Sequence, residues 1–302
     1  MPHIIKIPNV SEEVRIGSSF NHLVKVVAET ESTTEEVVWD FSGVRFMHPF
    51  FLAPLAIYRN SSKCGIECVN MSLNVQSYLN SIYFDRLLHF ASDEKEEVEK
   101  VMGKYADKSY IPLCTFSMTD ANKDAFGSVI QKVITEQTSI GANGLTPISY
   151  FISELLDNIY EHSQSENGYV FSQYLEREGV INLCIADEGI TVAGSYAKAG
   201  LYQKEIGQDE STALWLANEG CSTKNLPDAE NRGYGISTSK RMLVEGLGGS
   251  FFMLSGRAFH RFERGQNYYV NLGDLFCWQG TIILLRIPVK VPEGFNYIDY
   301  LE

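Results

Sequence analysis

Residues 151–162 read Phe151-Ile-Ser-Glu-Leu-Leu-Asp-Asn-Ile-Tyr-Glu-His162, and this stretch predicts an amphipathic helix. At about 3.6 residues per turn, the aliphatic side chains share one face, which carries Ile152, Leu155, Leu156 and Ile159. The opposite face carries Glu154, Asp157, Asn158 and Glu161. Asp and Asn are poor helix formers because their side chains compete for backbone hydrogen bonds. Their oxygens suit Mg²⁺, which combines one or two protein ligands with substrate phosphates; a solvated acidic face is the alternative.

Three glycine-containing segments follow this helix. Ile185-Ala-Asp-Glu-Gly-Ile190 ends an apolar run, Asn231-Arg-Gly-Tyr-Gly-Ile-Ser237 opens an apparent helix, and Gln279-Gly-Thr-Ile-Ile-Leu-Leu-Arg-Ile287 enters a strand. Glycine permits close approach of the backbone to a ligand, and a glycine pair at a helix start directs free N–H groups at an anion. Each glycine segment alone is also typical of a plain turn. The prediction of a ligand site therefore depends on the order of the acidic-amide helix and the three glycine segments.

In this order the segments resemble the ATP-binding domain of the GHKL family (gyrase, Hsp90, histidine kinase, MutL). Glu154-Leu-Leu-Asp-Asn158 resembles its N box, and Asp187-Glu-Gly189, Gly233-Tyr-Gly235 and Gly280-Thr281 resemble its glycine boxes. The segment from Ala213 to Lys224, which ends in Ser-Thr-Lys, resembles the lid over the nucleotide. The similarity covers roughly 110–290. Where the family often has a second glycine in the first box, this chain has Thr191, which puts the lid hinge in question.

The resemblance implies roles for five residues around the metal and the base. Asn158 would bind Mg²⁺ and bridge it to the phosphates of ATP. Glu154, one turn earlier, would orient or deprotonate an attacking water or hydroxyl. Asp187 would accept a hydrogen bond from the adenine amino group, with Gly189 leaving room for the base and Thr281 close to the same contact. Asp187 as a turn residue at a strand end is the structural alternative.

The resemblance also implies contacts with the phosphates. Gly233 and Gly235 would present backbone N–H groups to them, although a plain loop explains these glycines as well. Ser222, Thr223 and Lys224 would reach the γ-phosphate when the lid closes. Phosphoryl transfer depends mostly on positioning and charge stabilisation, so few side chains suffice to catalyse it.

The first third of the chain alternates apolar strand and helix patterns, which indicates a partly parallel α/β sheet. The segment Trp39-Asp-Phe-Ser-Gly-Val-Arg-Phe-Met47 resembles the central strand and turn of STAS domains, the anti-sigma-factor antagonist fold. The antagonists carry a phosphorylated serine in the following turn, but this chain reads His48-Pro49-Phe50-Phe51 there, without an acceptor hydroxyl. This region would therefore be an interaction module rather than a substrate.

We therefore expect an α/β protein of two domains. Residues 1–105 would form the STAS-like α/β domain, and residues 106–302 a two-layer α/β sandwich of GHKL type, with helices on one face of a mixed sheet. The patterns also predict several individual elements, namely helices over 50–60, 74–88 and 122–136, a linker over 107–112, a strand over 113–118 and a long lid loop over 191–232.

Composition narrows the class of protein. The net charge is −13 and the chain shows no Lys/Arg cluster, which argues against a nucleic-acid partner because phosphate-backbone binding needs cations. The chain lacks an apolar run of about 18 residues, so we expect no membrane span. Its start lacks a signal-peptide core, and its six cysteines are scattered, so we expect a cytoplasmic protein with reduced thiols.

Three functions remain open. The first is an ATP-dependent serine/threonine kinase or switch of anti-sigma-factor type, acting on a separate STAS or sigma-regulatory protein. His162 favours it, because the anti-sigma-factor branch tends to have His at the end of the N box. The second is an ATPase that drives a conformational cycle, and the third is a non-catalytic ATP-binding interaction module. Enzymatic activity, the identity of the partner and the oligomeric state, a homodimer included, are not fixed by the sequence.

Overall fold

The computed structural model describes residues 2–10, 16–62, 65–90, 95–221, 223 and 234–301. The chain has a mixed α/β structure with a three-stranded and an eight-stranded sheet. It divides into two compact units, Met1–Leu88 with Pro112–Cys114, and His89–Ile111 with Thr115–Glu302. The boundary expected between residues 105 and 106 lies inside the second unit.

Within its described residues, the first unit contains the parallel sheet β1-β2-β3 and three α-helices. Its strands are β1 (His3–Lys6), β2 (Val37–Asp40) and β3 (Ile66–Val69), and its helices are α1 (Ile16–Glu31), α2 (Pro49–Ser61) and α3 (Leu73–Ser81).

Helix α2 begins at the turn that the sequence analysis compared with the serine-bearing turn of STAS antagonists. The backbone N–H of Phe50 donates to His48 Nδ1 at 3.2 Å, and Pro49 occupies the first helical turn, where its missing N–H costs nothing. Every residue from Pro49 to Ile57 is buried. His48 is thus a helix cap, and the two phenylalanines pack in the core.

Helix α3 is shorter than expected. The pattern predicted a helix through residue 88, but α3 ends at Ser81. Tyr83 has a φ of 63°, in the left-handed region that a continuing α-helix excludes. The apolar positions after it belong to a turn, and Leu88 already opens the next strand.

Most of the larger sheet belongs to the second unit, and its order is β10-β9-β8-β11-β7-β6-β5-β4. The strands are β4 (Leu88–Phe90), β5 (Tyr110–Ser117), β6 (Asn167–Leu175), β7 (Val180–Asp187), β8 (Ser250–Gly256), β9 (Ala258–Glu263), β10 (Gln266–Asn271) and β11 (Trp278–Pro288). Its α-helices are α4 (Lys95–Met102), α5 (Asp120–Thr138), α6 (Ala142–His162), α7 (Val192–Ala199), α8 (Gln203–Ile206), α9 (Glu210–Asn218) and α10 (Tyr234–Arg241).

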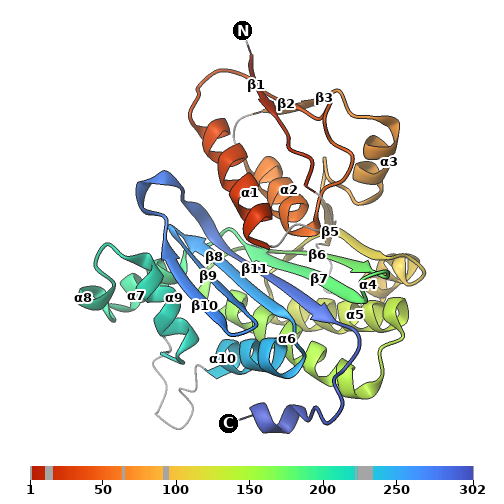
Figure 1. The fold of residues 1–302 in the computed structure, drawn as a ribbon, viewed down its shortest axis with the longest axis vertical. Helices are drawn as coiled ribbons and strands as arrows, with labels where there is room; N and C mark the ends of the chain where they lie inside the picture. Colours follow the sequence, from red (N-terminus) through yellow and green to blue (C-terminus); the bar gives the residue numbers. More distant parts are fainter. Residues whose placement is uncertain are drawn as a thin grey trace. The chain divides into compact units, whose positions relative to one another are not determined.

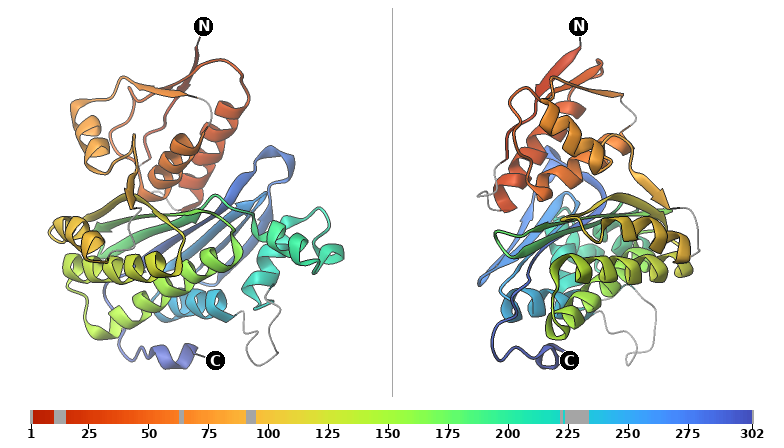
Figure 2. Two further views of the ribbon diagram at one scale, coloured as in Figure 1. Left: turned by 180° about the vertical axis from the view of Figure 1, so that it is seen from behind. Right: turned by 90° about the vertical axis from the view of Figure 1, so that its right-hand side faces the viewer.

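Strand β11 lies between β7 and β8 and is antiparallel to both. All eight residues of β7 are buried, as expected for a central strand. Helices α5, α6 and α10 cover one face of this sheet (Figures 1 and 2), and α9 contacts β9 and β10. The register pairs Thr281 of β11 with Asp187 at the end of β7, which brings two predicted site residues together.

Two expectations for this unit were wrong. Strand β5 begins at Tyr110, inside the expected linker over 107–112. The span expected to be a loop holds α7, α8 and α9, which bury a small core of their own made of Tyr196, Ile206, Ala213 and Leu216. The part of the lid over 224–233 lies outside the described residues. Among the described helices, none combines the length and the apolar character needed to cross a membrane.

Candidate functional site

Helix α6 carries the predicted acidic-amide face. Its apolar side chains are buried, and Glu154, Asp157, Asn158 and His162 are partly exposed on the other face. The expected amphipathic helix over 151–162 is therefore confirmed, as the C-terminal half of a longer helix.

A pocket opens beside this helix, with a volume of about 690 Å³ including its mouth. Four of the predicted site residues line it, namely Asn158 from α6, Asp187 from β7, Thr281 from β11 and Thr223. Apolar side chains form much of the rest, including Ile190, Met253 and Ile283. The pocket thus combines an apolar wall with a few converging polar groups.

Asp187 lies at the inner end of the pocket and is only 1% exposed. Its Oδ1 accepts the backbone N–H of Gly189 at 2.8 Å, and the backbone N–H of Thr281 donates to the same carboxyl. Burial raises the pKa of Asp187 to about 7, against the opposing effect of these two hydrogen bonds. With two donors among the described residues, this buried carboxyl retains acceptor capacity for a ligand.

Ser255 of β8 lies behind the pocket, where it contacts two of the lining residues, Val192 and Thr281, and the sequence analysis missed it. Its hydroxyl donates to the carbonyl of Gly280 at 3.0 Å, accepts the N–H of Val192 at 2.9 Å, and lies 3.0 Å from Thr281 Oγ1. These contacts join the start of α7 to β8 and β11. A serine within a buried strand has no distinctive sequence pattern, so no signal could have found it.

Two glycines beside Asp187 are explained by backbone crowding. A Cβ at Gly189 would overlap the backbone carbonyl of Ser163. At Gly280, φ is +80° and a Cβ would overlap the carbonyl of Asp187, so both conformation and space require glycine there. A side chain at Gly189 would therefore overlap protein backbone, so packing alone requires a glycine at this position.

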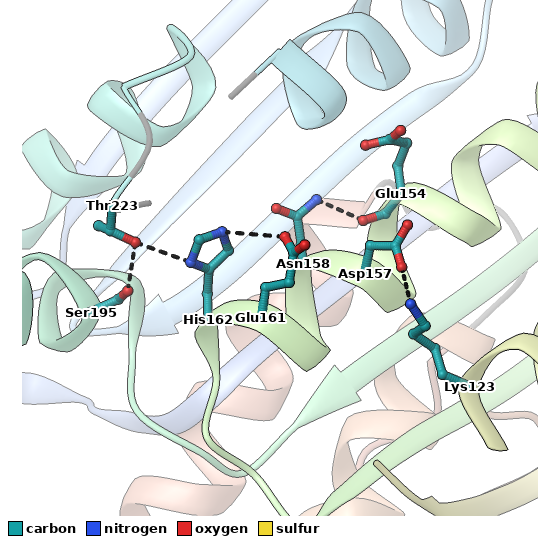
Figure 3. A network of polar contacts seen from close by, with 8 residues as sticks. All are labelled: Lys123, Glu154, Asp157, Asn158, Glu161, His162, Ser195 and Thr223. Atoms are coloured by element: carbon teal, nitrogen blue, oxygen red, sulfur yellow. Dashed lines mark hydrogen bonds and ion pairs between the residues drawn. The ribbon is translucent and has the colours of Figure 1, made fainter. Parts of the chain in front are cut away.

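Asn158 has a defined amide orientation. Its Nδ2 donates to the backbone carbonyl of Glu154 at 2.6 Å (Figure 3), and because a carbonyl only accepts, the other amide atom is the acceptor Oδ1. Within the described ranges, no group of three or more His, Cys, Asp or Glu could hold a metal ion. A metal at this site would therefore depend on Asn158 Oδ1 together with oxygens of a bound ligand.

Glu154 contacts the first turn of α10. A Cβ at Gly235 would overlap Oε2 of Glu154, so the carboxylate lies directly against the backbone of that glycine. Helix N-termini carry a partial positive charge that favours anions. The structure thus brings together the predicted base and one glycine of the second box, while the other glycine, Gly233, lies outside the described residues.

A polar chain crosses the pocket at the end of α6. His162 Nδ1 lies 3.0 Å from Thr223 Oγ1, which is 3.2 Å from Ser195 Oγ, and His162 Nε2 is 3.9 Å from a carboxylate oxygen of Glu161 (Figure 3). Thr223 is thus connected to both α6 and α7. The two other predicted lid residues, Ser222 and Lys224, lie outside the described residues.

The polar face of α6 also contains a contact that does not reach the pocket. Lys123 of α5 forms an ion pair with Asp157 (Figure 3), and the Lys123 side chain is only 11% exposed. Asp157 is thus occupied by a neighbouring helix and does not line the pocket.

Comparison with known proteins returned no match, either to a family model or to a curated protein sequence.

Proposed function

We propose that the pocket binds Mg-ATP and that the chain is an ATP-dependent regulatory protein acting on a separate protein. One observation carries this proposal. Asn158, Asp187 and Thr281 come from three distant segments and line one pocket, in the motif order that resembles the GHKL ATP-binding domain.

The inner end of the pocket suits a purine base. The Asp187 carboxyl is buried and accepts two backbone N–H groups, so an exocyclic amino group would supply a third donor. Thr281 Oγ1 lies beside it as a donor or acceptor for a ring nitrogen. Ile190, Met253 and Ile283 add apolar surface on which a planar base would pack.

The other end suits a triphosphate with its metal. Asn158 Oδ1 is the kind of ligand that Mg²⁺ accepts in combination with phosphate oxygens. The first turn of α10 lines the pocket through Ile236, and helix N-termini favour anions, but the Glu154 carboxylate already lies against Gly235. Because the chain carries a net charge of −13, a bound cation would also reduce repulsion between the protein and the nucleotide.

Glu154 would act as the base. It lies one helical turn before Asn158 on the same face of α6, so it is close to the place where a metal-bound γ-phosphate would lie. In the transfer step, an oxygen of a partner serine or threonine would attack the γ-phosphorus and pass its proton to Glu154. The bond to the β-phosphate oxygen would break, and ADP would leave with the electron pair. A water in place of the hydroxyl would make the chain an ATPase.

A separate partner is proposed because the first unit offers no acceptor at the STAS-type turn. His48 there caps α2, and the two following phenylalanines are buried. Because the chain resembles the anti-sigma-factor kinases, the partner would be a STAS or sigma-regulatory protein.

Binding is tested by calorimetric titration of the full chain with a non-hydrolysable ATP analogue and Mg²⁺. We expect Asn158→Ala to weaken binding at least about tenfold, or roughly 1.4 kcal/mol. Asp157→Ala is the matched control, because it removes the neighbouring polar side chain, which pairs with Lys123 instead of lining the pocket. Equal affinity in wild type and Asn158→Ala would reject the metal role.

The use of ATP is tested separately, with γ-labelled ATP and cell extract. Label on a second protein supports the kinase, and free phosphate alone supports the ATPase. The absence of both products supports the non-catalytic module. In both catalytic cases Glu154→Gln is expected to keep nucleotide affinity and to lose turnover.

A further inference from the structure

Three polar side chains form a row across neighbouring strands of the larger sheet. The register places Thr281 of β11 opposite Asp187 of β7 on one side and opposite Ser255 of β8 on the other. Residues directly opposite one another on adjacent strands point to the same face, with Cβ atoms about 4.5–5.5 Å apart. Asp187 and Thr281 line the pocket, whereas Ser255 is only 2% exposed and is not among the lining residues. Ser255 can therefore influence a ligand only through its neighbours.

The contacts of Ser255 use the whole hydrogen-bonding capacity of its hydroxyl. The hydroxyl donates to the backbone carbonyl of Gly280 at 3.0 Å and accepts the backbone N–H of Val192 at 2.9 Å. Its third contact is Thr281 Oγ1 at 3.0 Å. A serine hydroxyl has one proton and two lone pairs. Because the proton goes to Gly280 and one lone pair to Val192, the other lone pair accepts the proton of Thr281.

Two backbone groups hold the Ser255 hydroxyl in this orientation. The pairing of β11 with β8 is irregular between Trp278 and Thr281, and an irregularity of this kind leaves backbone groups out of the ladder, so a side-chain donor suits the Gly280 carbonyl. Val192 opens α7, and the first N–H groups of a helix have no partner within it. Since buried backbone groups are costly to leave unpaired, a rotation of the Ser255 proton away from Gly280 is unfavourable.

We propose that Ser255 is a positioning residue, which holds the hydroxyl proton of Thr281 away from the pocket and so presents only acceptors at its inner end. The Asp187 carboxylate and the Thr281 oxygen are then adjacent acceptors. An exocyclic amino group fits this pair because it carries two N–H donors, one for each oxygen. A carbonyl oxygen in the same place would face two acceptors and no donor. The choice of ligand rests on the proposed function, and the inference assigns the discrimination between amino and carbonyl bases to a residue outside the pocket.

The Ser255 contact is tested first without nucleotide, by amide hydrogen exchange at Val192 measured by NMR. We expect Ser255→Ala to speed this exchange at least about tenfold, because the N–H loses its acceptor. Ser172→Ala is the matched control. Ser172 is also a fully buried strand serine of this sheet, but its hydroxyl has no hydrogen-bond partner within the described part of the chain. Unchanged exchange in Ser255→Ala would overturn the proposal.

The discrimination is tested by calorimetric titration with the 5′-diphosphates of adenosine and inosine and Mg²⁺, which carry an amino group and a carbonyl at the same ring position. At pH 8 the Asp187 carboxyl, with a pKa of about 7, is mostly ionised. We expect wild type to prefer the adenosine nucleotide, and Ser255→Ala to lower that preference at least about tenfold, because the freed Thr281 proton would donate to the carbonyl. A merely structural role would weaken both nucleotides by the same factor, and that result would overturn the proposal.

Thr281→Val supplies the second half of the comparison. Without the Thr281 hydroxyl, adding Ser255→Ala should no longer change the preference, and an effect of Ser255→Ala that persists there would overturn the assigned route. If Ser255→Ala does not fold, Thr281→Val alone should weaken the adenosine nucleotide more than the inosine one, and equal weakening counts against the acceptor role.

The outcomes also separate this inference from the proposed function. Wild type that binds both nucleotides equally well would overturn the role of Ser255 and leave nucleotide binding in place. If wild type binds neither nucleotide, the proposed function and the discrimination fail together, whereas exchange at Val192 still decides the Ser255 contact.

Discussion

Replacing Asp187 by Asn should change how the stability of the protein depends on pH. Burial raises the pKa of this carboxyl from 3.8 to about 7, and the side chain is 1% exposed. Between these two pH values the folded state holds a proton that the unfolded chain has released. The free energy of unfolding of the wild type therefore falls as pH rises from about 4 to about 7, and the cost of the buried charge is complete above that range.

The magnitude follows from the same two values. Each pKa unit corresponds to about 1.4 kcal/mol, so the ionised carboxyl costs on the order of 4 kcal/mol above pH 7. Asn binds no proton at this position, and its Oδ1 is still able to accept the N–H groups of Gly189 and Thr281. The stability of Asp187→Asn relative to wild type should therefore rise by up to about 1.4 kcal/mol per pH unit from pH 4 to 7 and then stay constant.

The assay is urea unfolding at a series of pH values between 4 and 8.5, with linear extrapolation to water. Asp124→Asn is the matched control, since it makes the same chemical change on a side chain that is 79% exposed, where the effect should stay within about 0.5 kcal/mol. A difference between Asp187→Asn and wild type that is flat across this range would refute the reasoning. In the proposed function, the same variant should bind Mg-ATP at least about tenfold more weakly at pH 8, because the charged acceptor is lost.

Three further predictions concern stability and reactivity. Gly189→Ala should destabilise the protein by about 2 kcal/mol in urea unfolding, because the added methyl group overlaps a backbone carbonyl, and Gly43→Ala, with open space around its Cβ, should not. Lys240 is 4% exposed and burial lowers its pKa to about 8, so Lys240→Met should raise the free energy of unfolding by about 2 kcal/mol at pH 7. That gain should shrink between pH 8 and 10.5, where the wild type recovers the cost of the buried charge, and a gain that grows with pH would contradict this. Cys277 is exposed and should react with a thiol reagent in the native state at pH 8, whereas burial raises the pKa of two other thiols, which should react only after unfolding, namely those of Cys114 and Cys184.

Strongly periodic segments of the fold could be predicted from the sequence. The apolar stripe of α6 and the buried run of β7 have the spacing of a helix and of a central strand, and both elements are present. The short helices α7 and α9 were missed because eight and nine residues are too few for a clear period. They are defined by their caps instead, with Thr191 Oγ1 accepting the N–H of Gly194 and Asp209 accepting that of Ser211.

The sequence predicted which residues come together in the candidate site better than it predicted the hydrogen bonds between them. The order of the motifs named Asn158, Asp187 and Thr281, which the strand register and α6 bring to one pocket. The contacts of Ser255 depend instead on how α7 packs against β8 and β11, which involves residues far apart in the chain. A sequence pattern describes one element at a time, so it contains no signal for hydrogen bonds between elements of this kind.

The position of β11 has a consequence for how the protein is made. Of the eight strands in its sheet, β11 is synthesised last, yet it lies between β7 and β8. Until it leaves the ribosome, a nascent chain holds two half-sheets, each with an unpaired edge open to mispairing. Asp187 then lacks the backbone donor from Thr281 as well. We therefore expect chaperone protection to matter most in that interval.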